Sequence, residues 1–320
     1  MKRHYYAPAS VGNVSVGFDI LGLALAPEDG SHLGDVLTLT TATTTSLTLT
    51  GRYRHQLPDT LDDNLVLQCW HAFRERVPTA LPELAFELSK NLPVGSGLGS
   101  SACSIVVTCY ALNDFFGQPL ATERLMKLMG QLEGAMSGAT HYDNVAPSYF
   151  GGLQLLLANQ QATQVRLPWL DHWRIVVSYP GTVIRTADAR RVLPKQVPMT
   201  TASEAAAHLA GFISALYQGD EALALSCLID VLAEPYRQSL IPDLPRLRTQ
   251  AQQQGIQHLG ISGAGPTLFA ICRNAEEAQT MQHLFATQYH HTEDAMTHIC
   301  RIDTQGARCL DSQDNSHETR

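Results

Sequence analysis

The segment Pro93-Val-Gly-Ser-Gly-Leu-Gly-Ser-Ser-Ala-Cys103 decides the fold of this chain, because its three glycines lead directly into an apolar run over residues 104–112. The apolar run predicts a buried helix. Glycine lets the backbone approach an anion closely and adopt a positive φ angle, and the first turn of a helix offers unpaired N–H groups and the positive end of the helix dipole. The pattern therefore predicts a loop that holds the phosphates of a nucleotide.

The same segment allows other interpretations. An ordinary turn with Ser100 or Ser101 as helix cap would not require three alternating glycines. A Walker A loop is excluded, because none of the four lysines of the chain follows a glycine. The stretch Gly97-Leu-Gly-Ser-Ser-Ala102 formally fits a dinucleotide-binding loop with Asp114 as its ribose-binding acid. No regular series of alternating strands and helices surrounds it, which disfavours that interpretation.

Length and composition predict about two domains with a sizeable core, since the chain has 320 residues of which 44% are hydrophobic. No stretch is long and apolar enough for a membrane span or a signal peptide, so we expect a cytoplasmic protein with no membrane partner. The seven scattered cysteines and thirteen histidines predict neither a disulfide framework nor a zinc site. A net charge of −8 disfavours nucleic acid as a partner.

Hydrophobic periodicity predicts strands and helices that do not alternate strictly, which indicates an α+β fold. Residues 35–40 and 46–50 are expected to pair as a half-exposed hairpin. The polar run 159–164 suggests a hairpin tip or a boundary between an N-terminal domain (1–163) and a C-terminal domain (164–310), and 311–320 is expected to be a disordered tail. Further strands are predicted at 84–88, 151–157, 173–179, 258–261, 267–272 and 296–302, and helices at 62–73, 104–112, 122–133, 203–217, 221–232, 244–254 and 275–289.

Polar clusters outside the glycine loop are candidates for chemistry. Glu133 ends a predicted helix, where the dipole disfavours a carboxylate, so Mg²⁺ held by Glu133 and Ser101 is one interpretation and plain solvation is the other. Arginine binds carboxylates with two parallel hydrogen bonds, which makes Arg190 and Arg237 candidates for a small carboxylate substrate. Asn13 and Asp19, as well as the run His141-Tyr-Asp143-Asn144, could equally be turn residues.

Three segments of the chain together resemble the GHMP kinases, the superfamily that includes galactokinase, homoserine kinase and mevalonate kinase. Pro93–Cys103 resembles the ATP motif of that superfamily, Ala7-Pro-Ala-Ser10 its N-terminal motif, and Gly260-Ile-Ser-Gly-Ala-Gly-Pro-Thr267 its C-terminal glycine loop. The resemblance covers nearly the whole chain, from Lys2 to Leu310. It implies a two-domain fold, with an N-terminal domain like domain 2 of ribosomal protein S5, a ferredoxin-like C-terminal domain, and ATP in the cleft between them.

Within the superfamily, the segments 13–19, 132–138, 141–147, 234–237 and 298–303 resemble the homoserine kinase branch in its enterobacterial form. Val11-Gly12 before Asn13 departs from the Ser-Ala that is familiar there, which allows a small shift in the pocket wall. The resemblance implies in-line transfer of the γ-phosphoryl group of ATP, with Mg²⁺, to the side-chain hydroxyl of L-homoserine, in the first step of threonine synthesis. It also implies a homodimer. The alternatives are another acceptor such as mevalonate, or a module that binds without turnover.

The resemblance also implies roles for individual residues. Asp143 and Asp19 are the carboxylates near the hydroxyl, and some family members use an aspartate base whereas homoserine kinases are thought to manage without one. The implied ATP-binding residues are Asn64, Pro93, Val94, Gly95, Ser96, Gly97, Leu98, Gly99, Ser100, Ser101, Ala102 and Cys103; the metal residues are Ser101 and Glu133; the acceptor-binding residues are Asn13, Asp19, His141, Asn144, Arg190 and Arg237; the catalytic residues are Asp143, Asn144 and Thr186; and the supporting loop contains Gly263 and Gly265.

Overall fold

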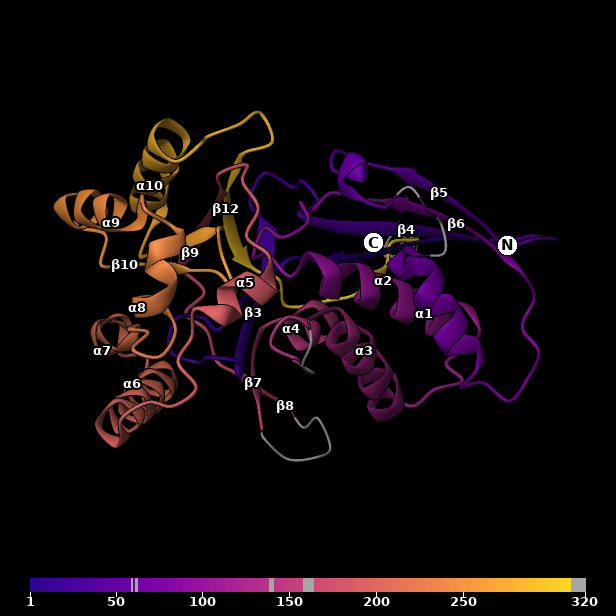
Figure 1. Ribbon diagram of the computed structural model, residues 1–320, viewed down its shortest axis with the longest axis horizontal. Coiled ribbons are helices and arrows are strands. Elements are labelled where there is room, and N and C mark those ends of the chain that lie inside the picture. The colour runs from indigo at the N-terminus through magenta and orange to yellow at the C-terminus, as the bar shows by residue number, and fades with distance from the viewer. Residues whose placement is uncertain (59, 61–62, 138–140, 158–163, 312–320) are drawn as a thin grey trace, which may run out of the picture.

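A computed structural model describes residues 1–58, 60, 63–137, 141–157 and 164–311 of the chain. Within these residues the strands form two sheets that lie side by side along the long axis, with helices packed against both (Figure 1). Most of the predicted boundary run 159–164 and of the predicted tail lies outside the described residues. None of the described helices is long and apolar enough to cross a membrane.

The first sheet has the strand order β13-β1-β4-β6-β5. Its strands are β1 (Lys2–Pro8), β4 (Gly34–Thr41), β5 (Ser46–Thr50), β6 (Leu84–Ser89) and β13 (Arg308–Cys309). The predicted hairpin of 35–40 with 46–50 is wrong: β6 lies between these strands, antiparallel to β4 and parallel to β5. The reason is burial, because β6 buries alternate residues of its length and suits a central position, whereas β5 buries only Leu47 and remains at the edge.

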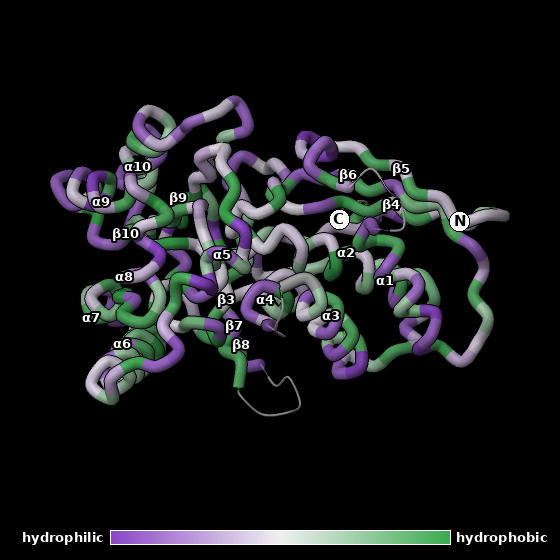
Figure 2. Tube along the Cα trace, viewed as in Figure 1, coloured by the Kyte–Doolittle hydropathy of each residue, from purple (hydrophilic) through white to green (hydrophobic). Residues whose placement is uncertain are grey.

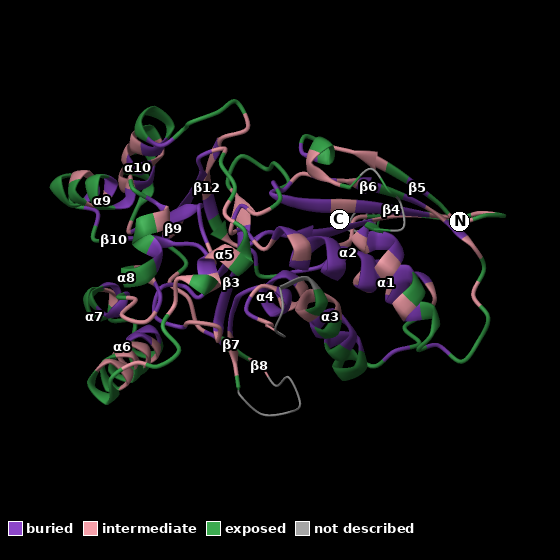
Figure 3. Ribbon diagram, in the orientation of Figure 1, coloured by how far each residue is buried: buried purple, intermediate pink, exposed green. Residues whose placement is uncertain are grey.

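Helices α1 (Leu65–Arg74), α2 (Ser100–Phe115), α3 (Thr122–Ser137) and α4 (Val145–Phe150) belong to the same half of the molecule as the first sheet, and η1 (Arg54–Gln56) follows β5. The helix predicted after the glycine loop is confirmed as α2, which begins at Ser100. Figure 3 shows α2 buried along almost its whole length, and Figure 2 shows it to be largely hydrophobic. A helix that is apolar on all sides requires such a position, and it fixes the glycine loop to the core.

The second sheet is antiparallel and has the order β10-β11-β9-β12-β3-β7-β8, with β2 paired to β3. The ferredoxin-like part is the antiparallel order β12-β9-β11-β10. β3 and β7 extend it from the N-terminal half of the chain, and β8 follows β7 at the edge. One sheet therefore runs through both halves, and the boundary at 163 remains a prediction. The strands are β2 (Ser10–Gly12), β3 (Leu21–Pro27), β7 (Leu153–Leu156), β8 (Gln164–Leu167), β9 (Arg174–Tyr179), β10 (His258–Ile261), β11 (Leu268–Cys272) and β12 (Met296–Ile302).

The C-terminal half also holds α5 (Thr186–Arg191), α6 (Met199–Gln218), α7 (Glu221–Cys227), α8 (Glu234–Arg237), η3 (Gln238–Leu240), α9 (Leu244–Gln253) and α10 (Ala275–Gln288). The helix predicted over 221–232 ends earlier, at Cys227. Beyond it the Asp230 carboxylate accepts hydrogen bonds from the backbone N–H groups of residues 232, 233 and 234, which holds a turn that leads into α8. Helix α8 carries Arg237.

Candidate active site

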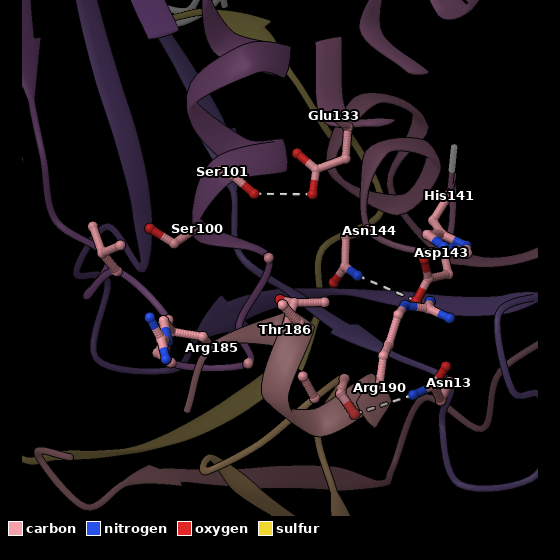
Figure 4. A pocket seen from close by; sticks show the side chains of 18 of the residues that line it. Asn13, Ser100, Ser101, Glu133, His141, Asp143, Asn144, Arg185, Thr186 and Arg190 are labelled. Carbon is pink, nitrogen blue, oxygen red and sulfur yellow. Dashed lines mark hydrogen bonds between the residues drawn. The ribbon is translucent and has the colours of Figure 1, made fainter. Parts of the chain in front are cut away.

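A cleft of about 380 Å³ lies where the glycine loop, the 13–19 loop, α5 and the 263–264 turn meet. It brings together most of the residues singled out in the sequence, although they come from distant parts of the chain (Figure 4). The predicted residues that line the cleft are Asn13, Asp19, Val94, Gly95, Ser96, Gly97, Gly99, Ser100, Ser101, Glu133, His141, Asp143, Asn144, Thr186, Arg190, Arg237 and Gly263.

The remaining predicted residues lie outside the cleft wall. Asn64 is buried and caps α1, where its side-chain oxygen accepts a hydrogen bond from the Val66 N–H at 3.0 Å. The thiol of Cys103 donates to the carbonyl of Ala7 behind the loop. The side chains of Asn64 and Cys103 thus bond to the backbone of neighbouring segments. The group consists of Asn64, Pro93, Leu98, Ala102, Cys103 and Gly265.

The glycine loop has the geometry of an anion cradle. Gly97 has a φ of +85°, and an added Cβ would lie 2.5 Å from the carbonyl oxygen of Ser262, so no side chain fits there. Gly99, with a φ of +67°, is the N-cap of α2, and no side chain in the described part of the chain caps that N-terminus. The interpretation of Ser100 or Ser101 as an ordinary cap is therefore wrong. The first-turn N–H groups of α2 are left for a ligand in the cleft.

Ser101 and Glu133 meet at one side of the cleft. Ser101 Oγ donates a hydrogen bond to Glu133 Oε1 at 2.9 Å, from α2 to α3 (Figure 4). Burial raises the pKa of Glu133, and the Ser101 hydroxyl opposes that shift only in part. Among the described residues no three or more His, Cys, Asp or Glu side chains gather to form a metal site. A hydroxyl and one carboxylate are instead the donor set that suits Mg²⁺ when phosphates complete its coordination.

The 13–19 loop begins with a left-handed turn. Asn13, Val14 and Ser15 have φ angles of +67°, +45° and +57°, and the turn is closed by a hydrogen bond from the Gly17 N–H to the Asn13 carbonyl at 2.8 Å. Such angles are rare outside glycine, most of all for a β-branched residue, and persist only where surrounding contacts impose them. One such contact joins Ser15 Oγ to Nε2 of the buried His258, at 2.9 Å.

The left-handed turn also places two cleft residues. The side chain of Asn13 accepts a hydrogen bond from the Asp19 N–H and donates one to the Gly263 carbonyl at 3.1 Å. It therefore holds the 13–19 loop against the C-terminal half. Asn13 and Asp19 are turn residues, as one interpretation of the sequence had it, and they line the cleft as well.

Two arginines at the same end of the cleft differ in their partners. Arg190 forms two hydrogen bonds with Asp19, at 2.7 and 3.2 Å. Arg237 is only 3% exposed and donates to the carbonyls of Gly263 and Ala189. Within the described residues Arg237 forms no ion pair, and both guanidinium groups lie over the ring of Phe18. Arg237 is therefore a buried cation without a direct ion pair in the part of the chain that the structure describes, although the charge of Asp230 reaches it, and such a group favours an anionic ligand.

Further polar atoms in this region indicate a polar ligand. In the described part of the chain, Arg190 Nε and His141 Nε2 are buried without hydrogen-bond partners. Burial lowers the pKa of His141, so its imidazole is neutral near pH 7. Buried polar atoms are normally satisfied, and a bound molecule would satisfy these.

Asp143 is the most strongly shifted carboxylate of the cleft. Burial, together with the negative charges of Asp19 and Glu133, raises its pKa to about 7. Its Oδ2 accepts a hydrogen bond from Asn144 Nδ2 at 3.2 Å, and Asn144 Oδ1 in turn accepts one from Ser10 Oγ at 2.9 Å. Asp143 and Asn144 are thus held in place by the N-terminal segment.

Sequence reasoning missed several residues of this site. Arg185 and Ala187 flank Thr186 in the cleft wall, and Ala264 follows Gly263. The Arg185 guanidinium is mostly exposed and pairs with Asp188 at 2.8 Å. In the sequence, the only signal for Arg185 is its position next to Thr186, a predicted site residue. Phe18 carried no sequence signal, because its role depends on two arginines from distant segments.

Comparison with known proteins gives consistent matches over both halves. The family model described as the GHMP kinases N terminal domain matches residues 64–152, and the model described as GHMP kinases C terminal matches residues 209–291. A solved structure of homoserine kinase from Cytophaga hutchinsonii is 29% identical, with a TM-score of 0.86 and 97% of each chain covered.

Two more distant structures share the fold. A putative homoserine kinase from Listeria monocytogenes is 24% identical, with a TM-score of 0.73, and the match covers 97% of this chain and 99% of that one. A phosphomevalonate kinase from Streptococcus pneumoniae, solved with phosphomevalonate and AMPPNP, is 13% identical, with a TM-score of 0.66 and coverage of 93% and 99%. Below 25% identity these matches describe the fold alone.

Proposed function

This chain belongs to the GHMP kinase family and is therefore a kinase, and we propose that its acceptor is the side-chain hydroxyl of L-homoserine. GHMP kinases use ATP, and the open N-terminus of α2 behind the glycine loop supports the placement of its triphosphate there. In-line transfer of the γ-phosphoryl group would yield O-phospho-L-homoserine and ADP. Positioning and charge neutralisation supply most of the catalysis in such transfers.

Ser101 and Glu133 are the residues that would hold Mg²⁺. Both line the cleft beside the glycine loop, and their oxygens already lie 2.9 Å apart. The bound ion would neutralise charge on the phosphates. The raised pKa of Glu133 fits this role, because a buried carboxylate ionises readily only when a cation lies close to it.

The single observation that carries the acceptor class is the buried, unpaired guanidinium of Arg237. Arg190 is paired with Asp19, so Arg237 is the one of these two arginines that has no ion-pair partner among the described residues and can take a carboxylate. Arg237 would bind the carboxylate of homoserine with two hydrogen bonds. Asp19 would hold the ammonium group while Arg190 turns toward the ligand, and Thr186, at the start of α5, would lie near the reacting groups.

Asp143 is the carboxylate best placed to accept the hydroxyl proton, in contrast to the expectation from the homoserine kinase branch that no base is used. Of the two carboxylates considered for this role, Asp19 is occupied by Arg190, whereas Asp143 lines the cleft without a cationic hydrogen-bond partner among the described residues. A base must be deprotonated, so kcat/KM should rise with pH through about 7. Asp143→Asn is expected to lower kcat by about 10²-fold and to flatten that pH profile. A change confined to KM would reject the role of base.

The same substitution gives a second readout in stability. The folded-state pKa lies above the usual 3.8, so the folded protein binds more protons and loses stability as pH rises from about 4 to 7. The asparagine of Asp143→Asn cannot titrate, so the variant does not lose this stability. The loss that it avoids is roughly 4 kcal/mol of unfolding free energy at pH 8. Urea denaturation at pH 5 and pH 8 should therefore show that the unfolding free energy of the variant, relative to that of the wild type, is higher at pH 8 than at pH 5. Equal differences at both pH values would contradict the buried, shifted carboxylate.

An ADP-release assay with ATP, Mg²⁺ and a panel of L-homoserine, L-serine, mevalonate and galactose tests the proposal. Turnover with L-homoserine alone is expected. Arg237 could also bind the carboxylate of mevalonate, but Asp19 would have no ammonium group to bind there, so mevalonate is the second candidate. ATP binding without turnover on any acceptor would indicate a silent binding module. Four points stay predictions: the enterobacterial type, the role in threonine synthesis, the cytoplasmic location and the homodimer.

A further inference from the structure

A buried ion pair lies directly beneath the glycine loop, outside the cleft. Lys90, directly after β6, is 1% exposed, and its Nζ lies 2.6 Å from Oδ2 of Asp35 on β4, which is fully buried. Neither residue lines the cleft. Sequence reasoning considered Lys90 only to exclude a Walker A loop, and gave Asp35 no role beyond a strand.

The pair connects the two ends of the loop. Lys90 Nζ donates to the Ser100 carbonyl at 3.0 Å and to Ser104 Oγ at 2.9 Å, both in the first turns of α2. Asp35 Oδ2 accepts from Ser104 Oγ at 2.6 Å, and Oδ1 accepts from the Asn91 N–H at 3.1 Å, just before the loop. The pair therefore binds the strand that enters the loop to the helix that leaves it.

Stability alone does not account for this arrangement. A buried ion pair loses most of its Coulomb energy to desolvation, and an apolar pair of similar volume is often equally stable. What the ion pair adds is direction, because each of its hydrogen bonds has a preferred geometry. The Ser100 carbonyl and the Ser101 N–H belong to the same planar trans peptide group and point in opposite directions. Holding the carbonyl from beneath thus aims the Ser101 N–H toward the cleft.

We propose that Lys90 and Asp35 are positioning residues that orient the first turn of α2 toward the nucleotide phosphates. Lys90 also cancels the charge of Asp35, which would otherwise stand behind the phosphates and repel them. The two members of the pair therefore have opposite effects on an anion, although both support the fold. This inference rests on the proposed placement of ATP at the glycine loop.

The experiment compares Lys90→Met, Asp35→Asn and the double variant Lys90→Met/Asp35→Leu by ATP titration calorimetry without acceptor. Lys90→Met should raise the Kd for ATP at least 10-fold, because it leaves the Asp35 charge unbalanced and leaves Ser104 Oγ, at 3.3 Å, as the side-chain donor to the Ser100 carbonyl. Asp35→Asn keeps Lys90 on that carbonyl and should bind ATP at least as tightly as the wild type. The double variant should fold with a Tm close to that of the wild type, yet bind ATP about 10-fold more weakly.

A purely structural pair would give a different pattern. In that case Lys90→Met and Asp35→Asn would both weaken ATP binding, in proportion to their loss of Tm. The double variant would bind ATP like the wild type. Either result overturns the proposal. Arg308→Met, which removes the partner of the buried Asp303 away from the cleft, is the matched control and should leave the Kd unchanged. If the wild type binds ATP but does not phosphorylate L-homoserine, only the proposed acceptor is refuted. If the wild type binds no ATP, both proposals are refuted.

Discussion

Replacing Arg237 by methionine is expected to raise the KM for L-homoserine by about 10²–10³-fold, with the KM for ATP within about twofold of the wild type. Methionine keeps much of the length and the apolar stem of the side chain, so the substitution removes chiefly the charge. In the wild type, the buried guanidinium is held by the carbonyls of Gly263 and Ala189 and is ready for a carboxylate. Steady-state kinetics with each substrate varied in turn measures the effect.

Arg185→Met is the matched control for this prediction. Arg185 lines the same cleft, but it is exposed and already paired with Asp188, so its loss should change the KM for L-homoserine by less than about threefold. Equal effects of the two substitutions would show that general positive charge, and not the buried guanidinium, attracts the acceptor. An unchanged KM in Arg237→Met would remove the main support for a carboxylate substrate.

Glu133→Gln is expected to lower kcat by about 10²–10³-fold at ordinary Mg²⁺ concentrations. Glutamine has the same shape and can still accept the Ser101 hydrogen bond, so the substitution isolates the negative charge. Without that charge the metal binds more weakly, and more Mg²⁺ should be needed for half-maximal activity. A titration of activity against Mg²⁺ at saturating ATP and L-homoserine separates these effects.

Glu123→Gln serves as the control, since Glu123 lies in the first turn of the same helix and is exposed. It should leave both kcat and the Mg²⁺ requirement unchanged. If Glu133→Gln lowers kcat but needs no more Mg²⁺ than the wild type, Glu133 acts through something other than the metal. Wild-type activity in Glu133→Gln would refute the metal assignment altogether.

The parts of this fold that the sequence predicted are those with local causes. The glycine loop and α2 follow from neighbouring residues, because the glycines, the missing cap and the apolar run are all contiguous. The parts that it did not predict depend on distant partners. The insertion of β6 between β4 and β5, the pair of Lys90 with Asp35 and the contact of Arg190 with Asp19 each join segments that no periodicity connects.

The left-handed turn at Asn13 shows the same limit in the backbone. Asparagine accepts a positive φ angle, so Asn13 is compatible with the turn, but Val14 opposes it and the sequence gives no reason for three successive positive φ angles. The turn is imposed by Gly263 and His258, more than 240 residues away along the chain. The sequence could therefore name Asn13 and Asp19 as candidates, but not the conformation that presents them to the cleft.

The ladder between β3 and β12 joins the two halves of the chain in one sheet. Because Leu25, Ala26 and Pro27 share a hydrogen-bonded ladder with residues 300–302, separating the two halves would expose a sheet edge on each of them. Such edges recruit other strands and promote aggregation. The two halves are therefore not interchangeable modules, and recombining one with its counterpart from a relative would require that both sides of this ladder be exchanged together.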